Sequence, residues 1–428
     1  MKAKIITKLP GIKSEKIINR LKKLNGAYNS PYPFVYSKEG SGAYFKDIDG
    51  NTFLDFASNI ASTPLGYNHP NIKKVIRQYS SRCPIKYAGQ DFNLKEHADL
   101  IEELLTTTTL NRAFLVNSGA EAVENSIKIA MRNNPKAKFG ISFTSAFHGR
   151  TLGALSNTDS REVQKRNFFT IPTKRLPFSD EAPEELLRIL DEEASPKEVA
   201  YVILEHVQGE GGYNPASKKM VKEIYSICKS NGITYIADEV QAGMGRTGEW
   251  WAHNHYNIKP NIFSVAKALQ VGAAVSSKEF FPKEEGSLSS TWGGGHVIDM
   301  AVGLETIKTI KKSGLLSKNT RNGKYILKLL NESNSIISNP RGLGLMCAFD
   351  LPTAKMRDDV VIESLNNGLV ILGCGKSGIR LIPPFIINKT EIDEAFKILN
   401  KAIEKCSKKG FRHRGKICNF LSCGEDIS

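Results

Sequence analysis

The chain has 428 residues, of which 40% are hydrophobic and 24% are charged, and its formal net charge is +15. This composition is that of a globular protein and excludes a fibrous or wholly disordered chain. At roughly 150 residues per domain, the length predicts two or three domains. No apolar run approaches the roughly 18 residues that a membrane-spanning helix needs.

The N-terminus mixes charged and apolar residues throughout, and the seven cysteines are spread over the chain. These features predict reduced thiols and a cytoplasmic protein that does not enter a membrane. Basic residues are concentrated only at 405–416, so we expect no nucleic-acid partner. The sequence indicates no metal site, because the spacing of Cys406, His413, Cys418 and Cys423 is not that of a zinc site.

Taken in chain order, residues 1–30 predict a basic helix that ends at Gly26. Residues 42–56 predict a hairpin, because the turn Asp49-Gly50-Asn51 separates two β-rich runs. From about 70 to 300, amphipathic helices alternate with short apolar runs that are mostly β-branched or aromatic. This alternation predicts a parallel sheet with helices on both faces, and such sheets bind ligands beyond the carboxyl ends of their strands.

After about residue 315 the pattern changes to one of helix, several short strands and a final helix. We therefore divide the chain into residues 1–65, which contribute to a small domain, and residues 66–312, which form a large cofactor-binding domain. Residues 313–405 complete a small α+β domain, and residues 406–428 form a basic tail that we expect to be mobile.

Four predicted strand ends carry unusual polar groups. Asn117-Ser118-Gly119-Ala120-Glu121 stands between a strand and a helix, where backbone N–H groups can approach an anion. Asp238 and Lys267 each end an apolar strand, where an isolated charge is costly. Phe147-His148-Gly149-Arg150 sets an aromatic face beside a guanidinium, which suits a planar anion.

Each of these motifs alone also has an ordinary explanation: a turn, a helix cap, a solvated lysine or a core aromatic residue. In combination they match the needs of pyridoxal 5'-phosphate. Its phosphate needs a glycine-containing turn, its ring a stacking partner, its ring nitrogen a carboxylate and its aldehyde a lysine.

The motifs NSGAEAVENSIKIA, FHGRT, EHVQGEGGY, IADEVQAGMGRTG and the Lys267 strand occur here in an order that resembles class III aminotransferases. That family belongs to the fold-type I pyridoxal phosphate enzymes and includes 4-aminobutyrate, ornithine and acetylornithine aminotransferases. The segments GLVILGCG and IRLIPPF resemble archaeal members. The resemblance implies an α/β fold with a mostly parallel, seven-stranded sheet between helices, together with a small α+β domain.

The resemblance also implies a role for each matching residue. Lys267 would hold the cofactor as an internal aldimine and shuttle a proton, and Asp238 would pair with the ring nitrogen. The remaining contacts to the cofactor would come from Ser118, Gly119, Ala120, Phe147, His148, Val240, Gln241 and Thr291. Thr291 would reach the phosphate from a neighbouring subunit, so the resemblance implies a homodimer or a higher homo-oligomer.

For the substrate, Arg380 would clamp the α-carboxylate, Glu210 would gate Arg380, and Arg150 would bind the distal carboxylate. Glu205 would act as an acceptor behind the site. The implied reaction moves an amino group from an ω-amine or amino acid to 2-oxoglutarate. The chain departs from the family at His206, where proline is usual, and at Gln270, where a run of glycines is usual.

Two alternatives to this function stay open. An amino-acid racemase would use the same Lys267 and Asp238 but return the proton to the opposite face of the substrate carbon. A catalytically idle homologue would instead serve as a basic binding or regulatory protein.

Overall fold

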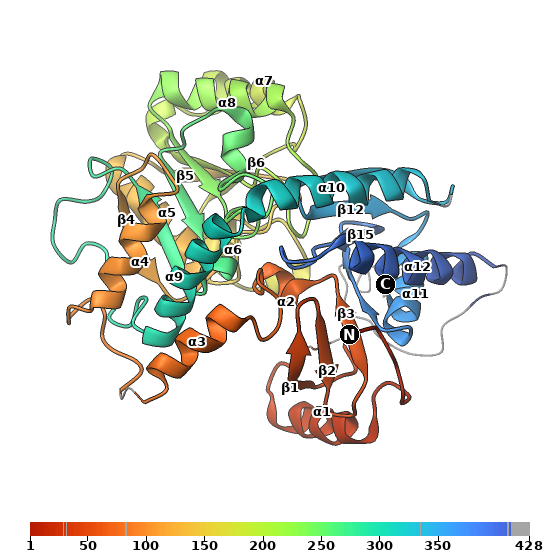
Figure 1. Ribbon diagram of the computed structural model, residues 1–428. Coiled ribbons are helices and arrows are strands. Elements are labelled where there is room, and N and C mark those ends of the chain that lie inside the picture. Colours follow the sequence, from red (N-terminus) through yellow and green to blue (C-terminus); the bar gives the residue numbers. More distant parts are fainter. Residues whose placement is uncertain (29, 31, 82–83, 334, 409–410, 412–428) are drawn as a thin grey trace. The chain divides into compact units, whose positions relative to one another are not determined.

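The computed structural model describes residues 1–28, 30, 32–81, 84–333, 335–408 and 411. Its contacts divide the chain into two compact units (Figure 1), Asn71–Ser317 and the combination of Met1–Pro70 with Lys318–Ser428. Most of the predicted mobile tail, with three of the four tail residues considered as metal ligands, lies outside the described residues, whereas Cys406 ends the last helix. No helix in the described part of the chain is long and apolar enough to span a bilayer.

The unit Asn71–Ser317 is built on a seven-stranded sheet with the order β4-β10-β9-β8-β7-β5-β6. Its strands are β4 (Arg112–Val116), β5 (Phe139–Phe143), β6 (Thr173–Leu176), β7 (Val199–Leu204), β8 (Thr234–Asp238), β9 (Ile262–Val265) and β10 (Gly272–Ser276). The predicted fold class is confirmed. The sheet is not wholly parallel, however, because β10 pairs antiparallel with both β4 and β9.

Helices cover both faces of this sheet (Figure 1). Those of the unit are α3 (Pro70–Tyr79), α4 (Lys95–Leu105), α5 (Gly119–Asn133), α6 (Leu152–Asn157), α7 (Ala182–Arg188), α8 (Lys218–Asn231) and α9 (Val297–Lys312). Every residue of β7 is buried, as expected for a strand covered on two sides. Its Val202 and Leu204 join a core cluster with residues of α8, whereas Ile203 joins another with residues of α5.

Short helical turns complete the unit: η1 (Glu162–Gln164), η2 (Ile189–Glu193), η3 (Pro196–Glu198), η4 (Ala252–Tyr256) and η5 (Lys267–Leu269). The longer helices have ordinary caps. Ser217 accepts the N–H of Met220 at the start of α8, and Gly232 adopts a left-handed conformation at its end.

The other unit contains two four-stranded sheets. One has the order β1 (Tyr36–Ser41), β2 (Tyr44–Asp47), β3 (Thr52–Asp55) and β13 (Leu369–Val370), and the other has β11 (Ser338–Leu343), β12 (Met346–Asp350), β15 (Gly378–Leu381) and β14 (Leu372–Cys374). The hairpin predicted at 42–56 is confirmed, with Tyr44 opposite Leu54. The helices of this second unit are α1 (Ile12–Leu24), α2 (Ser58–Ala61), most of α10 (Leu315–Asn331), α11 (Ala354–Asn366) and α12 (Lys389–Cys406).

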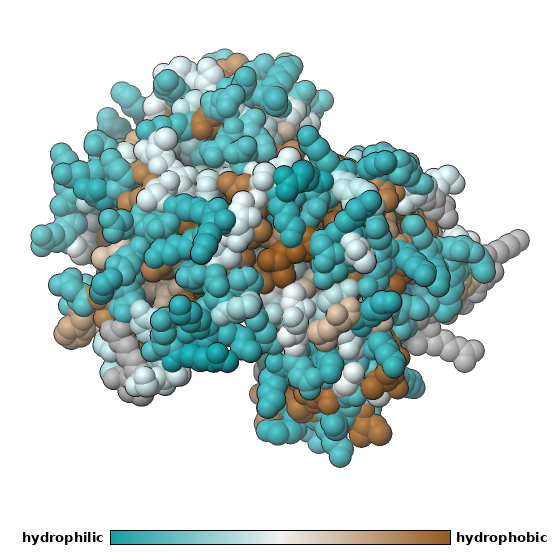
Figure 2. Space-filling view, viewed as in Figure 1, coloured by the Kyte–Doolittle hydropathy of each residue, from teal (hydrophilic) through white to brown (hydrophobic). Residues whose placement is uncertain are grey.

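The surface shown in Figure 2 is mainly hydrophilic, as expected of a globular chain in which 24% of the residues are charged. Hydrophobic atoms gather at the foot of that view, where Figure 1 places α1. Ile12 and Leu24 of this helix are exposed.

Candidate active site

The polar motifs identified in the sequence leave the seven-stranded sheet at one edge. Because β10 runs antiparallel to both β4 and β9, these two strands run in the same direction. Parallel pairing extends that direction through β8, β7 and β5. The carboxyl ends of these strands therefore meet at a common edge, which is where α/β sheets bind their ligands.

Asp238 and Lys267 follow adjacent strands at this edge. Asp238 ends β8 and lies opposite Ser264 of β9, and the N–H of Glu239 donates to the carbonyl of Ser264 over 2.9 Å. Lys267 comes three residues after Ser264 and has a φ of +47°. Such a value is uncommon outside glycine and often marks a functional site.

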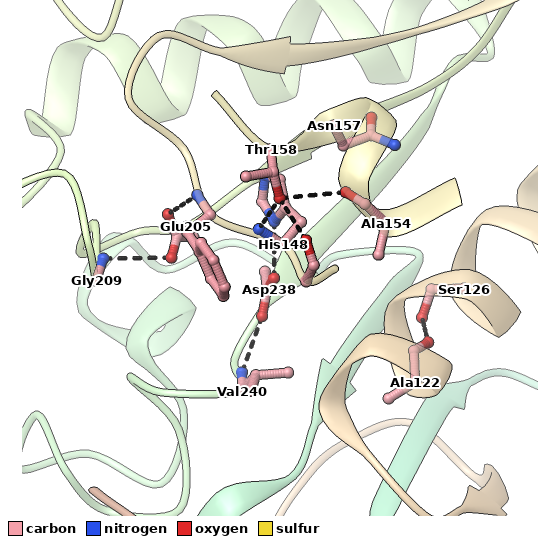
Figure 3. A network of polar contacts seen from close by, with 12 residues as sticks. Ala122, Ser126, His148, Ala154, Asn157, Thr158, Glu205, Gly209, Asp238 and Val240 are labelled. Atoms are coloured by element: carbon pink, nitrogen blue, oxygen red, sulfur yellow. Dashed lines mark hydrogen bonds and ion pairs between the residues drawn. The ribbon is translucent and has the colours of Figure 1, made fainter. Parts of the chain in front are cut away.

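The carboxylate of Asp238 is buried and held from two sides (Figure 3). Nδ1 of His148 lies 2.7 Å from Oδ2, and the N–H of Val240 donates to Oδ1 over 3.0 Å. These contacts offset part of the cost of removing a carboxylate from water. The backbone N–H of His148 in turn donates to the hydroxyl of Thr158 over 2.9 Å.

Glu205 follows β7 and lies beside this pair. Its carboxylate accepts the N–H groups of Phe147 and Gly209 over 3.1 and 3.2 Å (Figure 3). Burial raises the pKa of Glu205 to about 7, while His148 lowers it and Asp238 raises it. Glu205 therefore acts as an acceptor for the turn that carries Phe147, as the sequence analysis expected.

The turn Ser118–Ala120 opens α5, and the hydroxyl of Ser118 accepts the N–H of Glu121 over 3.2 Å. It packs closely against the other motifs. A Cβ on Gly119 would approach Cγ1 of Val240 to 2.8 Å, and one on Gly149 would approach Cβ of Ala120 to 2.9 Å. The first N–H groups of a helix lack partners within it, so this end of α5 suits an anion.

Phe147 and Gln241 lie at the same edge. The guanidinium carbon of the exposed Arg150 is 5.0 Å from the ring centroid of Phe147, so the ring face already meets a planar cation. Oε1 of Gln241 accepts the hydroxyl of Tyr213 over 2.5 Å. A Cβ on Gly209 would lie 2.9 Å from Nε2 of Gln241.

These residues fit pyridoxal 5'-phosphate. The N-terminus of α5 can bind the phosphate, Phe147 offers a ring face, and the buried Asp238 can balance a positive ring nitrogen. Nε2 of His148 is buried and, among the described residues, has no hydrogen-bond partner. Lys267 supplies the amine at the neighbouring strand end.

For three further predicted site residues, no described contact links the side chain to the cluster around Asp238 and Lys267. Thr291 is exposed, and Glu210 lies in the glycine-rich turn after β7. Arg380 is 5% exposed on β15, opposite Ala348, and belongs to the other unit. The roles of Thr291, Glu210 and Arg380 stay predictions.

Two site residues were not predicted from the sequence. Thr158 holds the backbone of His148, and Tyr213 holds the amide of Gln241. Thr158 lies 10 residues beyond His148, across a short helix, and nothing in the sequence indicates that contact. Tyr213 directly follows Gly211-Gly212, and the glycine pair could have indicated a tight turn that returns its side chain to the site.

Comparison with known proteins agrees with this geometry. Residues 26–403 match the family model for "Aminotransferase class-III". An acetylornithine aminotransferase of Archaeoglobus fulgidus is 35% identical over 85% of this chain and 94% of its own length. Another, from Caldanaerobacter subterraneus, is 33% identical over 90% of this chain and 98% of its own length.

Solved structures support the same fold. The ornithine aminotransferase of Toxoplasma gondii has a TM-score of 0.84 and 26% identity, covering 94% of this chain and 97% of its own. A lysine aminotransferase from M. tuberculosis in the internal aldimine form has a TM-score of 0.86 at 24% identity, covering 92% of this chain and 100% of its own.

The chain belongs to the class III aminotransferases. It is an enzyme of the acetylornithine/ornithine type, and the cofactor of the family is pyridoxal 5'-phosphate, as the sequence analysis predicted. Its substrates are an amino donor and a keto-acid acceptor. The alternative of a catalytically idle homologue is wrong.

Proposed function

We propose that the enzyme moves the amino group of an ω-amino donor, of the acetylornithine, ornithine or 4-aminobutyrate type, to 2-oxoglutarate to give glutamate. The observation that carries the cofactor chemistry of this proposal is the placement of Asp238 and Lys267 at adjacent strand ends beside the N-terminus of α5. Relatives at 33% and 35% identity are named for acetylornithine, which supports a donor of that type.

Bound pyridoxal phosphate supplies an aldehyde that reacts with amines and a ring that accepts the electron pair released at the substrate carbon. Asp238 would keep the ring nitrogen protonated, because a buried carboxylate stabilises a neighbouring positive charge. His148 and the N–H of Val240 hold that carboxylate at 2.7 and 3.0 Å, so it is already in place before charge develops.

Lys267 would hold the aldehyde in the resting enzyme and would then carry a proton to and from the substrate carbon at its Nζ. Ser118, Gly119 and Ala120 would bind the phosphate through the hydroxyl and the N–H groups at the start of α5. Phe147 would stack on one face of the ring and Val240 on the other, with Gln241 near the ring hydroxyl.

Substrate recognition would rest on two cations. Arg380 would bind the α-carboxylate of the keto acid, and Arg150 the distal carboxylate, which favours a dicarboxylate acceptor. Glu210 would pair with Arg380 while an ω-amine is bound and release it for 2-oxoglutarate. Thr291 of a neighbouring subunit would complete the phosphate site, so the proposed active form is at least a dimer.

The two half-reactions test this proposal separately. Stopped-flow mixing of the loaded enzyme with N-acetylornithine, ornithine, 4-aminobutyrate or lysine should convert the visible band of the cofactor to a near-ultraviolet band. Adding 2-oxoglutarate should restore the visible band and release glutamate. A band that no ω-amine converts, or that pyruvate restores faster than 2-oxoglutarate, would contradict the proposed substrates.

The racemase alternative predicts a different outcome in a simpler reaction. A single L-amino acid without any keto acid should stay L with an aminotransferase. Accumulation of the D-isomer would favour racemisation instead.

A further inference from the structure

Arg175, on β6 at the border of the sheet, has a guanidinium that is surrounded by acceptors. The side chain is 25% exposed. It donates to the carbonyls of Ser156, Asn157 and Thr158 over 3.0, 3.3 and 3.1 Å and to the hydroxyl of Ser142, and its Nε lies 3.4 Å from Oδ1 of Asp159. A guanidinium has five N–H donors, and this environment offers acceptors from five residues.

The carbonyls that Arg175 contacts lie at the end of α6. The last carbonyls of a helix have no partner within it, and a cation is favourable there. Because α6 has only six residues, a cation that binds the carbonyls of Ser156 and Asn157 stabilises a third of the helix. The contact with the carbonyl of Thr158 extends this hold to the segment that follows the helix.

Thr158 and Asp159 in turn hold the turn that carries Phe147 and His148. The hydroxyl of Thr158 accepts the N–H of His148 and donates to the carbonyl of Gly149, both over 2.9 Å (Figure 3). The carboxylate of Asp159 accepts the N–H of Ser145 over 2.7 Å. The backbone N–H of Asp159 donates to the carbonyl of Ala146 over 2.6 Å.

The turn from Ser145 to Gly149 needs this support. Ser145 has a φ of +59°, which residues other than glycine rarely adopt, and Gly149 has a φ of +132°, which requires glycine. A strained turn keeps its shape only when surrounding contacts impose it. The contacts from Thr158 and Asp159 reach this turn on every residue but Phe147, whose N–H is held by Glu205.

We propose that Arg175 is a positioning residue of the enzyme, acting through Thr158 and His148 on the carboxylate of Asp238. The last contact in this series is the 2.7 Å approach of Nδ1 of His148 to Oδ2 of Asp238. The inference rests on the proposed role of Asp238 toward the ring nitrogen of the cofactor. The charged or titratable groups beside Asp238 include His148 and Glu205, and Lys267 follows the neighbouring strand.

The test compares Arg175→Gln, Arg175→Lys and Thr158→Val in the holoenzyme. The control is Arg188→Gln, because Arg188 is another arginine of this unit that contacts Glu185, Glu192 and Glu193 on the surface and nothing in the series. The readouts are the pH midpoint of the visible band of the bound cofactor, the dissociation constant of the cofactor and Tm.

If Arg175 positions Asp238, Arg175→Gln should move the pH midpoint by about half a unit or more and weaken cofactor binding about fivefold, an effect of about 1 kcal/mol. Arg175→Lys should restore part of both effects, and Arg188→Gln should change neither. A lower Tm with an unchanged midpoint, measured well below Tm, would show a merely structural role and overturn the inference.

Double variants decide whether the effect passes through Thr158. Residues that act in one series give non-additive effects. The variant Arg175→Gln/Thr158→Val should therefore move the midpoint no further than the larger single effect, and a sum of the two shifts would overturn the inference. Should Arg175→Gln not fold, Arg175→Lys and Thr158→Val give the same comparison.

Failure of the proposed function would look different. If the wild-type protein bound no cofactor or its band did not respond to amines, the proposed function itself would fail. A responsive wild type whose midpoint is the same in every Arg175 variant would refute only the positioning role.

Discussion

Asp238 is a carboxylate that the folded chain removes from water, leaving it 4% exposed, and holds by His148 and the N–H of Val240. In the proposed role toward the ring nitrogen, this group would act through its charge rather than through its shape. Substitution by asparagine keeps the size and one acceptor oxygen but removes the charge. This substitution therefore separates the effect of the charge from the effect of the size of the side chain.

We expect Asp238→Asn to lower kcat/KM at least about a hundredfold, or about 3 kcal/mol, because the ring nitrogen loses its counterion. Steady-state kinetics with saturating cofactor measure this loss. A reduction of less than about tenfold would remove Asp238 from its proposed role.

Glu205 carries a second residue-scale prediction, which concerns stability. Burial raises its pKa from 4.5 to about 7 in the folded chain. Between these two pH values only the folded chain keeps the proton, so the free energy of unfolding falls as pH rises through this window. The contribution present below pH 4.5 should be lost above about pH 7, and amounts to about 3 kcal/mol.

Urea unfolding of the cofactor-free protein at several pH values measures this contribution as the difference between wild type and Glu205→Gln. The wild type should lose more stability than the variant as pH rises from 4.5 to 7. Parallel pH profiles for the two proteins would show that Glu205 does not retain its proton in the folded state.

At the scale of elements, the turn between β4 and α5 depends on close packing. A Cβ on Gly119 would lie 2.8 Å from Cγ1 of Val240, closer than such atoms approach. We therefore expect Gly119→Ala to weaken cofactor binding more than about tenfold and to cost about 1–3 kcal/mol of stability. Cofactor titration and chemical unfolding measure the two effects.

Gly26→Ala is the matched control for this substitution, because a Cβ there meets nothing within 4 Å. It should leave both properties unchanged. If Gly119→Ala bound the cofactor as tightly as the control, the start of α5 would not be the phosphate site.

The strands that carry Asp238, Lys267 and Phe147 were all predicted from continuous apolar runs. The direction of β10 was not, because a helix–strand alternation favours parallel pairing throughout. Only residues 266–271 separate β9 from β10, which is too short for a parallel crossover of about a dozen residues. That spacing could have indicated the antiparallel strand.

Contacts between strand ends were harder to predict than the strands. His148 follows β5 and contacts Asp238 at the end of β8, although β7 lies between these strands in the sheet. The turn after β5 and the side chain of His148 together therefore span two strand positions, and no local pattern in the sequence encodes such a reach. The strand β6 consists of three polar or charged residues followed by Leu176, which is no apolar run, so no strand was predicted around Arg175.

At the scale of the whole molecule, the proposed site would take Thr291 from a second chain. Thr291 is exposed on the described chain, which leaves it accessible to a partner. If Thr291 serves the neighbouring subunit, a dimer of one Lys267→Ala chain and one Thr291→Ala chain contains one intact site. In a wild-type dimer with twofold symmetry, each chain would supply its Thr291 to the site of the other.

Mixing the two variants after unfolding and refolding should therefore raise activity, measured at limiting cofactor, above that of either alone. Random pairing would restore up to about a quarter of the wild-type activity, since half of the dimers are mixed and each has one intact site. Activity equal to the mean of the separate variants would place Thr291 in the site of its own chain.

Covalent attachment of the cofactor to Lys267 is the claim on which the account depends most. Reduction of the loaded enzyme with borohydride, followed by proteolysis and peptide mass spectrometry, identifies the lysine that carries the cofactor. We predict that the label lies on the peptide containing Lys267 and that Lys267→Ala carries none. A label on any other lysine, or a label that persists in the variant, would contradict the account.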